Sequence, residues 1–292
     1  MRDIGNEPDL RVRNALYAWK HVDAESADVV EDIMATLAPD EPYAYTVAPP
    51  PEDRASSIPH QEFRLTRAGI QAAYEDMHRF SLSLGIDPLA EIRSDWYAFI
   101  FGLGHGMDKA TGAKHMDRQT AVLFPTMGQH GITGELFWFR TSTEAPYTGG
   151  RTGPRAAEVA NLARHDALVE AFRRNEVSAV LELFNVNAQI GIRDYVNETG
   201  TVISITGRNS LESYLEELFA RFKVVSIDIV QRITTDWCVF AELRWVVEDQ
   251  KQSGEKFMFY TANHGEVRPD GLFSSLIGHG TEPVRWGDHR TG

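Results

Sequence analysis

The sequence contains one cysteine, Cys238, among its 292 residues. A single cysteine cannot form a disulfide within the chain, and metal sites built from several thiolates are excluded as well. Long apolar runs are also missing. The run at Trp96–Leu103 is shorter than the roughly 20 residues that a membrane-spanning helix needs, and the N-terminal residues lack the apolar stretch of a signal peptide. We therefore expect a soluble, cytoplasmic protein.

Basic residues are scarce. Lysine and arginine total 29 against 42 aspartate and glutamate residues, which gives a net charge of −13. Nucleic acids and anionic membranes bind basic protein surfaces, so we expect neither as a partner. Hydrophobic residues make up 42% and charged residues 24%, which is typical of folded domains. A chain of this length most often forms two domains.

Sequence motifs for cofactors and metal ions are also missing. The chain has no His-x-x-x-His or His-Glu-x-x-His pair, and Gly102–Gly106 ends a predicted strand instead of opening a helix, as a phosphate-binding loop would. One alternative stays open, because His105, His115 and Asp117 could converge across neighbouring strands. We expect no cofactor and no metal ion.

What the sequence does contain is an internal repeat. Ser94–Phe99 is similar to Thr235–Phe240, which lies 141 residues later, and Arg67 and Arg208 have the same separation. Two similar halves with one order of elements are best explained by duplication. Residues 1–140 are predicted to form one domain, with an inserted loop at 48–60, and residues 156–280 a second. A linker at 141–155 and a tail at 281–292 complete the chain.

Hydrophobic periodicity predicts the same order in each half: helix, short helix, two strands, helix and three long strands. The expected helices cover 14–21, 27–37, 66–84, 156–174, 178–184 and 210–222, and the expected strands include 43–47, 92–103, 188–195 and 237–247. Helices at the front of each half and long strands at its back indicate an α+β fold.

Three short segments of the first half carry a family resemblance. Gly102–Gly106 is similar to a Gly-Thr-His-Thr-Gly strand end, Thr111–Lys114 to a Thr-Gly-Lys turn, and His130–Glu135 to an Asp-Gly-Lys-Ile-Val-Glu hairpin. These motifs occur in this order in the NTF2-like superfamily, in its SnoaL-like and ketosteroid-isomerase-like branch. The resemblance covers roughly 12–140 and 156–280. It implies two tandem cones, each a curved mixed or antiparallel sheet wrapped around helices and enclosing one pocket.

The resemblance also implies a class of chemistry. Enzymes of this branch work by acid–base catalysis without a cofactor, and the chain is similar in build to two-domain diarylpropane lyases. Such a lyase acts on a small aromatic, lignin-derived diol and releases water and formaldehyde to give a stilbene. The alternatives are a dehydratase, isomerase or cyclase of the same branch, or a non-catalytic module for ligand binding or assembly.

The candidate catalytic residues are Tyr43, His60 and Lys114. In the family an acid or base stands on the first strand after the helices. Tyr43 lies there, whereas the carboxylate of steroid isomerases is absent. His60 lies in the inserted loop, and the Lys114 ammonium could hold a substrate phenolate. The predicted substrate-binding residues are Tyr45, Tyr97 and His105. Each could instead be structural: the tyrosines in the core, His60 and Lys114 on the surface.

Other polar residues are given structural roles. His130 and His264 each precede a glycine, which predicts a place in a hairpin turn. In the second half, Asp194, Tyr195, Arg244 and Tyr260 lie on segments with the charge pattern of a solvated or interfacial sheet face. We expect the second domain to serve structure and assembly, and the chain to form a homo-oligomer through its sheet faces. The expected ligand is a small apolar or aromatic substrate.

Overall fold

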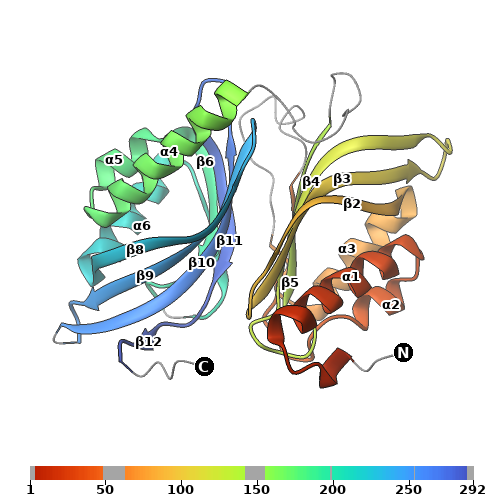
Figure 1. Ribbon diagram of the computed structural model, residues 1–292, viewed down its shortest axis with the longest axis horizontal. Helices are drawn as coiled ribbons and strands as arrows, with labels where there is room; N and C mark the ends of the chain where they lie inside the picture. Colours follow the sequence, from red (N-terminus) through yellow and green to blue (C-terminus); the bar gives the residue numbers. More distant parts are fainter. Residues whose placement is uncertain (1–3, 49–62, 142–154, 198, 253, 288–292) are drawn as a thin grey trace. The chain divides into compact units, whose positions relative to one another are not determined.

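The computed structural model describes residues 4–48, 63–141, 155–197, 199–252 and 254–287 (Figure 1). These residues form two compact units, which we call unit 1 (within residues 4–141) and unit 2 (within residues 155–287). Most of the predicted inserted loop at 48–60, with His60, and most of the predicted linker at 141–155 lie outside the described residues. No helix in the described ranges is long and apolar enough to cross a membrane.

Unit 1 packs three helices and a short 3-10 turn against one five-stranded sheet. Its elements are η1 (Ile4–Asn6), α1 (Leu10–Ser26), α2 (Val30–Met34), β1 (Ala44–Ala48), α3 (Arg67–Phe80), β2 (Ser81–Arg93), β3 (Tyr97–Asp108), β4 (Lys114–Pro125) and β5 (Gly134–Thr141). The strand order is β1-β5-β4-β3-β2. Only the β1–β5 pair is parallel, and all the others are antiparallel.

Unit 2 repeats this arrangement with a seven-stranded sheet in the order β7-β6-β11-β10-β9-β8, to which β12 adds by pairing with β10. Its elements are α4 (Arg155–Arg173), α5 (Val177–Glu182), β6 (Phe184–Arg193), β7 (Val202–Thr206), α6 (Arg208–Arg221), β8 (Phe222–Thr234), β9 (Cys238–Asp249), β10 (Glu255–Val267), β11 (Phe273–Gly280) and β12 (Val284–Arg285). The first strand, β6, is again parallel to the last long strand, β11.

In each unit the helices lie together on one face of a curved sheet (Figure 1). Thr66 caps the N-terminus of α3 by accepting a hydrogen bond from the Gly69 N–H, as expected for a threonine before a helix. In unit 1 the apolar faces of α1, α2 and α3 pack against the inward side chains of β3 and β4. The predicted α+β class with two sheet-and-helix cones is confirmed.

The repeat extends to the irregularities of the sheets. The β2–β3 ladder shifts register between Ser83 and Gly85, and the β8–β9 ladder shifts between Val224 and Ser226, 141 residues later. A second shift in each ladder, at Pro88 and at Ile229, keeps the same separation. Bulges bend a strand and increase its twist. The two sheets are therefore curved at the same places, as duplication predicts.

A matching hydrogen bond ties the first helix of each unit to a strand turn. The Asn14 side-chain amide donates to the Ser94 carbonyl at 3.0 Å in unit 1. In unit 2 the Asn161 amide donates to the Thr235 carbonyl at 2.9 Å. Ser94 and Thr235 stand 141 residues apart, so the bond lies at the same place in both units.

Three expectations from the sequence were wrong in detail. The helix predicted at 66–84 ends at Phe80, and four long strands follow it instead of three. The missed strand β2 contains Gly85 and Pro88, which disfavour regular strands, but both lie at bulges on the edge of the sheet, where they are tolerated. His264 lies buried within strand β10 and not in a turn. His130 does lie in the turn between β4 and β5 and is exposed.

Candidate active site

The interior of unit 1 contains an unusual group of buried polar side chains. They are His21 and Glu25 of α1, Tyr45 of β1, Tyr74 of α3 and Glu135 of β5, and each is less than a tenth exposed. We call these five residues the polar cluster. His21 and Glu25 are four residues apart, which places them on one face of the helix. Tyr45 and Glu135 are partners in the β1–β5 register.

The hydrogen bonds of His21 determine where one of its protons lies. Its Nδ1 is 2.6 Å from the Thr36 hydroxyl oxygen. That hydroxyl donates its only proton to the Ile33 carbonyl at 2.6 Å. Because a hydroxyl has one proton, the Thr36 oxygen must accept from His21, so Nδ1 carries a proton. The state of the other ring nitrogen, Nε2, then depends on Tyr74.

Tyr74 connects His21 to Glu135. The Tyr74 hydroxyl lies 2.7 Å from His21 Nε2 and also hydrogen-bonds Glu135 Oε2. In one arrangement Nε2–H donates to Tyr74, which donates to an ionised Glu135. In the other, a protonated Glu135 donates to Tyr74, which donates to a neutral His21. The two differ only by moving two protons along existing hydrogen bonds. We call His21, Tyr74 and Glu135 the proton relay.

Burial and mutual charge perturb the groups around the relay. Desolvation, followed by the charge of Glu135, raises the pKa of Glu25 well above its ordinary value. The same two causes raise the pKa values of Tyr45 and Tyr74 well above that of a free phenol. Glu25 is therefore held in its neutral form over a wider pH range than an exposed glutamate. Several titratable groups perturbed in one place are typical of catalytic sites.

Part of the cluster could also hold a cation. One ligand atom each from His21, Glu25 and Glu135 lie within 4.8 Å of one another. An imidazole with two carboxylates suits several divalent ions. His21 Nε2 is, however, already bonded to Tyr74, and a metal ion would have to displace that hydroxyl. The expectation that the protein needs no metal ion stays a prediction.

The structure places the two predicted strand tyrosines in the core of unit 1, on the same side of the sheet. Tyr43 is 1% exposed and its hydroxyl donates to the Ala38 carbonyl at 2.6 Å, which is a structural contact. Tyr45 packs against Tyr74 with ring centroids 5.2 Å apart and belongs to the polar cluster. Among the predicted site residues that the structure describes, Tyr45 is thus the one in ring contact with the relay.

The other predicted residues lie elsewhere. Lys114 is exposed at the start of β4. His105 Nε2 pairs with Asp87 across β3 and β2 at 2.8 Å. Tyr97 is fully buried beside Trp96, on the face of β3 opposite to Ala98. The roles predicted for these three residues and for Tyr43, Tyr45 and His60 stay predictions. So does a site that includes His115 and Asp117, whose side chains are outside the described part.

Unit 2 allows a direct comparison because its residues can be aligned with those of unit 1. The matched asparagine bonds align α1 with α4, and the separation of 141 aligns α3 with α6. The cross-strand pairs Leu123–Leu136 and His264–Ile277 align β5 with β11. On this basis His21, Glu25, Tyr45, Tyr74 and Glu135 correspond to Leu168, Phe172, Ile190, Leu215 and Leu276.

All five counterparts in unit 2 line one apolar cavity of about 70 Å³. Trp245, Phe259 and Leu243 of the sheet also face it, with Asn263 as one of its few polar residues. His165 borders the same cavity. Burial and the nearby Arg232 guanidinium lower the pKa of His165 to about 4, so it is neutral near pH 7. The same position in the fold is therefore polar in unit 1 and apolar in unit 2.

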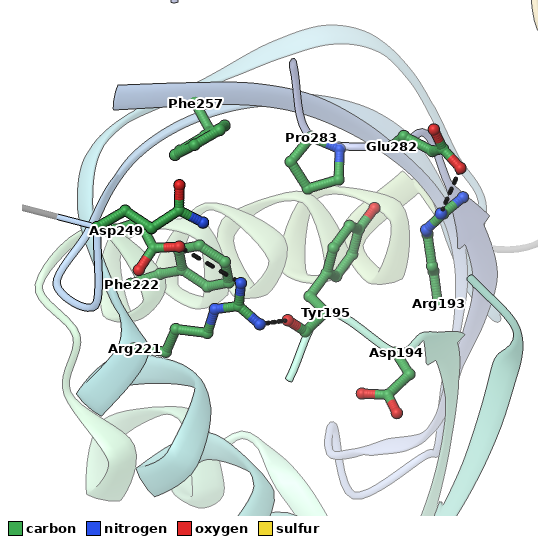
Figure 2. A pocket seen from close by; sticks show the side chains of 10 residues that line it. Arg193, Asp194, Tyr195, Arg221, Phe222, Asp249, Phe257, Glu282 and Pro283 are labelled. Atoms are coloured by element: carbon green, nitrogen blue, oxygen red, sulfur yellow. Dashed lines mark hydrogen bonds and ion pairs between the residues drawn. The ribbon is translucent and has the colours of Figure 1, made fainter. Parts of the chain in front are cut away.

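Unit 2 also contains a cleft of about 250 Å³ near its C-terminal strand (Figure 2). Its charged side chains are already engaged. Arg221 donates to the carbonyls of Tyr195 and Val196 and pairs with Asp249 at 3.4 Å. Arg193 pairs with Glu282 at 3.2 Å (Figure 2). Arg193 thus holds the chain at Gly280 and Glu282 against the unit, and Arg221 joins the residues after β6 to the end of β9; both are structural roles.

The sequence contains only weak signs of the four members of the polar cluster that were not predicted, which are His21, Glu25, Tyr74 and Glu135. His21-x-x-x-Glu25 is a helical pair of potential acid–base groups, but the search for metal motifs considered only pairs of histidines. Tyr74 lies within the helix predicted at 66–84, and a tyrosine there is typical of an apolar helix face, but its hydroxyl lies among polar partners. Glu135 lies in the segment resembling a family hairpin. The convergence of these three depends on the tertiary fold and not on any spacing in the chain.

No protein-family model matches the sequence, and no curated protein matches it. Solved structures similar in fold each match about the length of one unit. An NTF2-like protein of unknown function from Burkholderia pseudomallei is 12% identical, with a TM-score of 0.36 over 41% of this chain and 89% of its own. A Catenulispora acidiphila protein with a ketosteroid-isomerase-like fold, solved with trimethylamine, is 15% identical, with a TM-score of 0.34 over 41% and 85%. An LEH-like epoxide hydrolase from Mycobacterium tuberculosis is 13% identical, with a TM-score of 0.35 over 43% and 84%.

Proposed function

We propose that the protein is an acid–base enzyme whose reacting groups are the polar cluster of unit 1. One observation carries this proposal. His21, Tyr74 and Glu135 form a buried chain of hydrogen bonds that can change its protonation pattern without breaking. Such a chain can give a proton to a substrate at one end and recover it at the other.

The reaction that we propose is an elimination from a small aromatic diol, in the class of carbon–oxygen and carbon–carbon lyases. The relay gives a proton to the benzylic hydroxyl, and the C–O bond breaks as water leaves. A base takes the proton of the other hydroxyl, whose oxygen forms a carbonyl. The C–C bond to that carbon then breaks, and its electron pair forms the new C=C bond. The products are water, formaldehyde and a stilbene.

A low-polarity environment supports this chemistry. The relay is enclosed by the apolar core of unit 1, which includes Phe124, Val122 and Ile100. Exclusion of water strengthens each hydrogen bond to a developing charge. An aromatic substrate would also gain from contact with the ring-rich interior. The cytoplasmic location and the homo-oligomer through the sheet faces remain proposals beside this one.

The test is turnover of a panel of phenolic diols by the full chain. Stilbene is followed by its absorbance and formaldehyde by trapping, with matched mono-alcohols as substrate controls. Tyr74→Phe removes the connecting proton while keeping the ring, and we expect turnover to fall by about 10²-fold or more. Tyr43→Phe is the matched control, because the Tyr43 hydroxyl donates to the Ala38 backbone carbonyl and is not part of the relay. Full turnover by Tyr74→Phe would contradict the proposal.

A second candidate function, ligand binding, is favoured by the cavity of unit 2. The cavity is apolar, and the Asn263 side-chain oxygen has no hydrogen-bond partner among the described residues. We expect phenol, which can donate one hydrogen bond, to bind more tightly than toluene. Trp245 lines the cavity, so its fluorescence reports binding. Ala241→Leu should fill the cavity and abolish the response. Equal responses from wild type and this variant would exclude the site.

A further inference from the structure

A second buried histidine of unit 1, His78, lies next to the polar cluster and contacts a carboxylate. His78 lies on α3 and its Nδ1 is 2.6 Å from Asp28 Oδ1. Lys109 donates to the other oxygen of Asp28 at 2.5 Å and to the His78 carbonyl. Asp28 is itself held in a left-handed backbone conformation, with φ at 59°, just after α1. Three separate segments thus meet at this histidine.

The tautomer of His78 follows from these contacts. Hydrogen bonds from Lys109 above all, and also from His78, lower the pKa of Asp28, so its carboxylate is ionised and can only accept. Nδ1 must therefore carry the proton that it shares with Asp28. The other ring nitrogen, Nε2, is then the unprotonated one in a neutral ring. A carboxylate that fixes a histidine in this way prepares Nε2 to accept a proton.

Nε2 is also buried and unsatisfied. His78 is 6% exposed, and its Nε2 has no hydrogen-bond partner among the residues that the structure describes. The two ring nitrogens point in diverging directions, so Nε2 is directed away from Asp28 and Lys109, both of which are partly exposed. Buried acceptors are seldom left without a donor. A ligand with a hydroxyl group would provide one.

His78 lies beside Tyr74, the middle member of the relay. His78 and Tyr74 are four residues apart on α3, and their rings meet edge to face with centroids 6.2 Å apart. Both side chains are buried, on the face of α3 that packs toward the core. A substrate that reaches the relay would therefore lie beside the ring that carries Nε2.

We propose that His78 Nε2 is the base that accepts the proton of a substrate hydroxyl, and that Asp28 is its positioning residue. This rests on the proposed function, to which it adds the second proton acceptor. In the step, the substrate O–H bond breaks and an Nε2–H bond forms. The electron pair left on oxygen forms the carbonyl of formaldehyde, and the imidazolium is stabilised by Asp28.

Kinetics on a 1,2-diarylpropane-1,3-diol test the catalytic role. We expect His78→Gln to lower kcat by at least about 10²-fold with a much smaller change in KM. Asp28→Asn should lower kcat by at least about tenfold, because its amide can favour the wrong tautomer. His130→Gln, at an exposed turn position, is the control and should retain wild-type kcat. If Tyr74→Phe is inactive while both His78→Gln and Asp28→Asn keep full kcat, this inference fails and the proposed function stands.

A spectroscopic measurement tests His78 even if no diol reacts. In the ¹⁵N spectrum of the full-length protein, His78 should show a protonated Nδ1 and an unprotonated Nε2. Added phenol should shift the Nε2 signal as it donates a hydrogen bond, and the shift should be absent in His78→Gln. A protonated Nε2 at rest, or no shift at saturating phenol, would overturn the inference without bearing on the relay.

Discussion

The two units share a frame and differ in their interiors. Bulges, strand order and the asparagine-to-turn bond recur at matching places, yet five polar side chains in unit 1 stand where unit 2 has leucine, isoleucine and phenylalanine. Buried polar groups stabilise a fold less than apolar ones unless every member is bonded. This contrast supports the proposal that the polar cluster takes part in a reaction and that unit 2 does not.

The largest expected effect is that activity depends on one unit only. Glu135→Gln keeps the shape of the relay but removes its acid, so turnover should fall by about 10²–10⁴-fold. At the equivalent position of unit 2, Leu276→Met conserves volume and should leave turnover unchanged. Steady-state kinetics on the same diol compare the two. Equal losses in both variants would mean that the units act together.

Transplanting the acid into unit 2 should damage its stability. Leu276→Glu places a carboxylate in the apolar cavity of unit 2. The polar partners His21 and Tyr74 are absent there, because Leu168 and Leu215 occupy the corresponding positions. An unpaired buried charge costs about 3–5 kcal/mol. Urea denaturation of the full chain, followed by Trp245 fluorescence, measures the loss. A loss below about 1 kcal/mol would show that the cavity admits enough water to solvate the charge. Leu276→Gln serves as the uncharged control.

Acid should weaken unit 2 through His165. Its folded pKa of about 4 is below the ordinary 6.5, so the unfolded chain takes up the proton first. The stability that neutral His165 contributes is fully present above pH 6.5. It is lost as the pH falls toward 4, by about 3 kcal/mol in total. His165→Leu should remove this part of the pH dependence. His279, whose pKa burial also lowers to about 4, stays in the variant as an internal reference. Parallel pH profiles for wild type and variant would refute the assignment.

Unit 1 should respond to pH in the opposite sense through Glu25. Its folded pKa is raised, so the native state holds its proton more tightly than the unfolded chain. Stability is then greatest below the ordinary pKa near 4.5 and declines as the pH rises through the folded value. The decline is about 1.4 kcal/mol per pH unit inside that window. Thermal melts of Glu25→Gln should show no such decline, and a decline equal to wild type would assign the effect elsewhere.

Much of the fold of the two units could be predicted from the sequence. Helix periodicity, the repeated Asp-Trp segments and the family motifs gave the α+β halves and their duplication. The edge strand β2 was missed because Gly85 and Pro88 hide its pattern, which only the bulged edge position explains. The relay was missed because its members are far apart in the sequence: His21 and Tyr74 by 53 residues, and Tyr74 and Glu135 by 61. They meet only when β5 pairs with β1 and α3 packs against the sheet. Tyr45, predicted to bind substrate, lies beside Tyr74 in the structure.

The asparagine-to-turn bonds bear on how the units fold. Asn14 and Ser94 are separated by 80 residues, and Asn161 and Thr235 by 74. Closing a loop costs an entropy that grows only with the logarithm of its length, by about 0.6 kcal/mol for each doubling. The two closures are therefore almost equally costly, and both units have similarly non-local contacts. Since contact order largely sets folding rates, the two units should fold on similar timescales, and differences in their lifetimes should arise from their interiors.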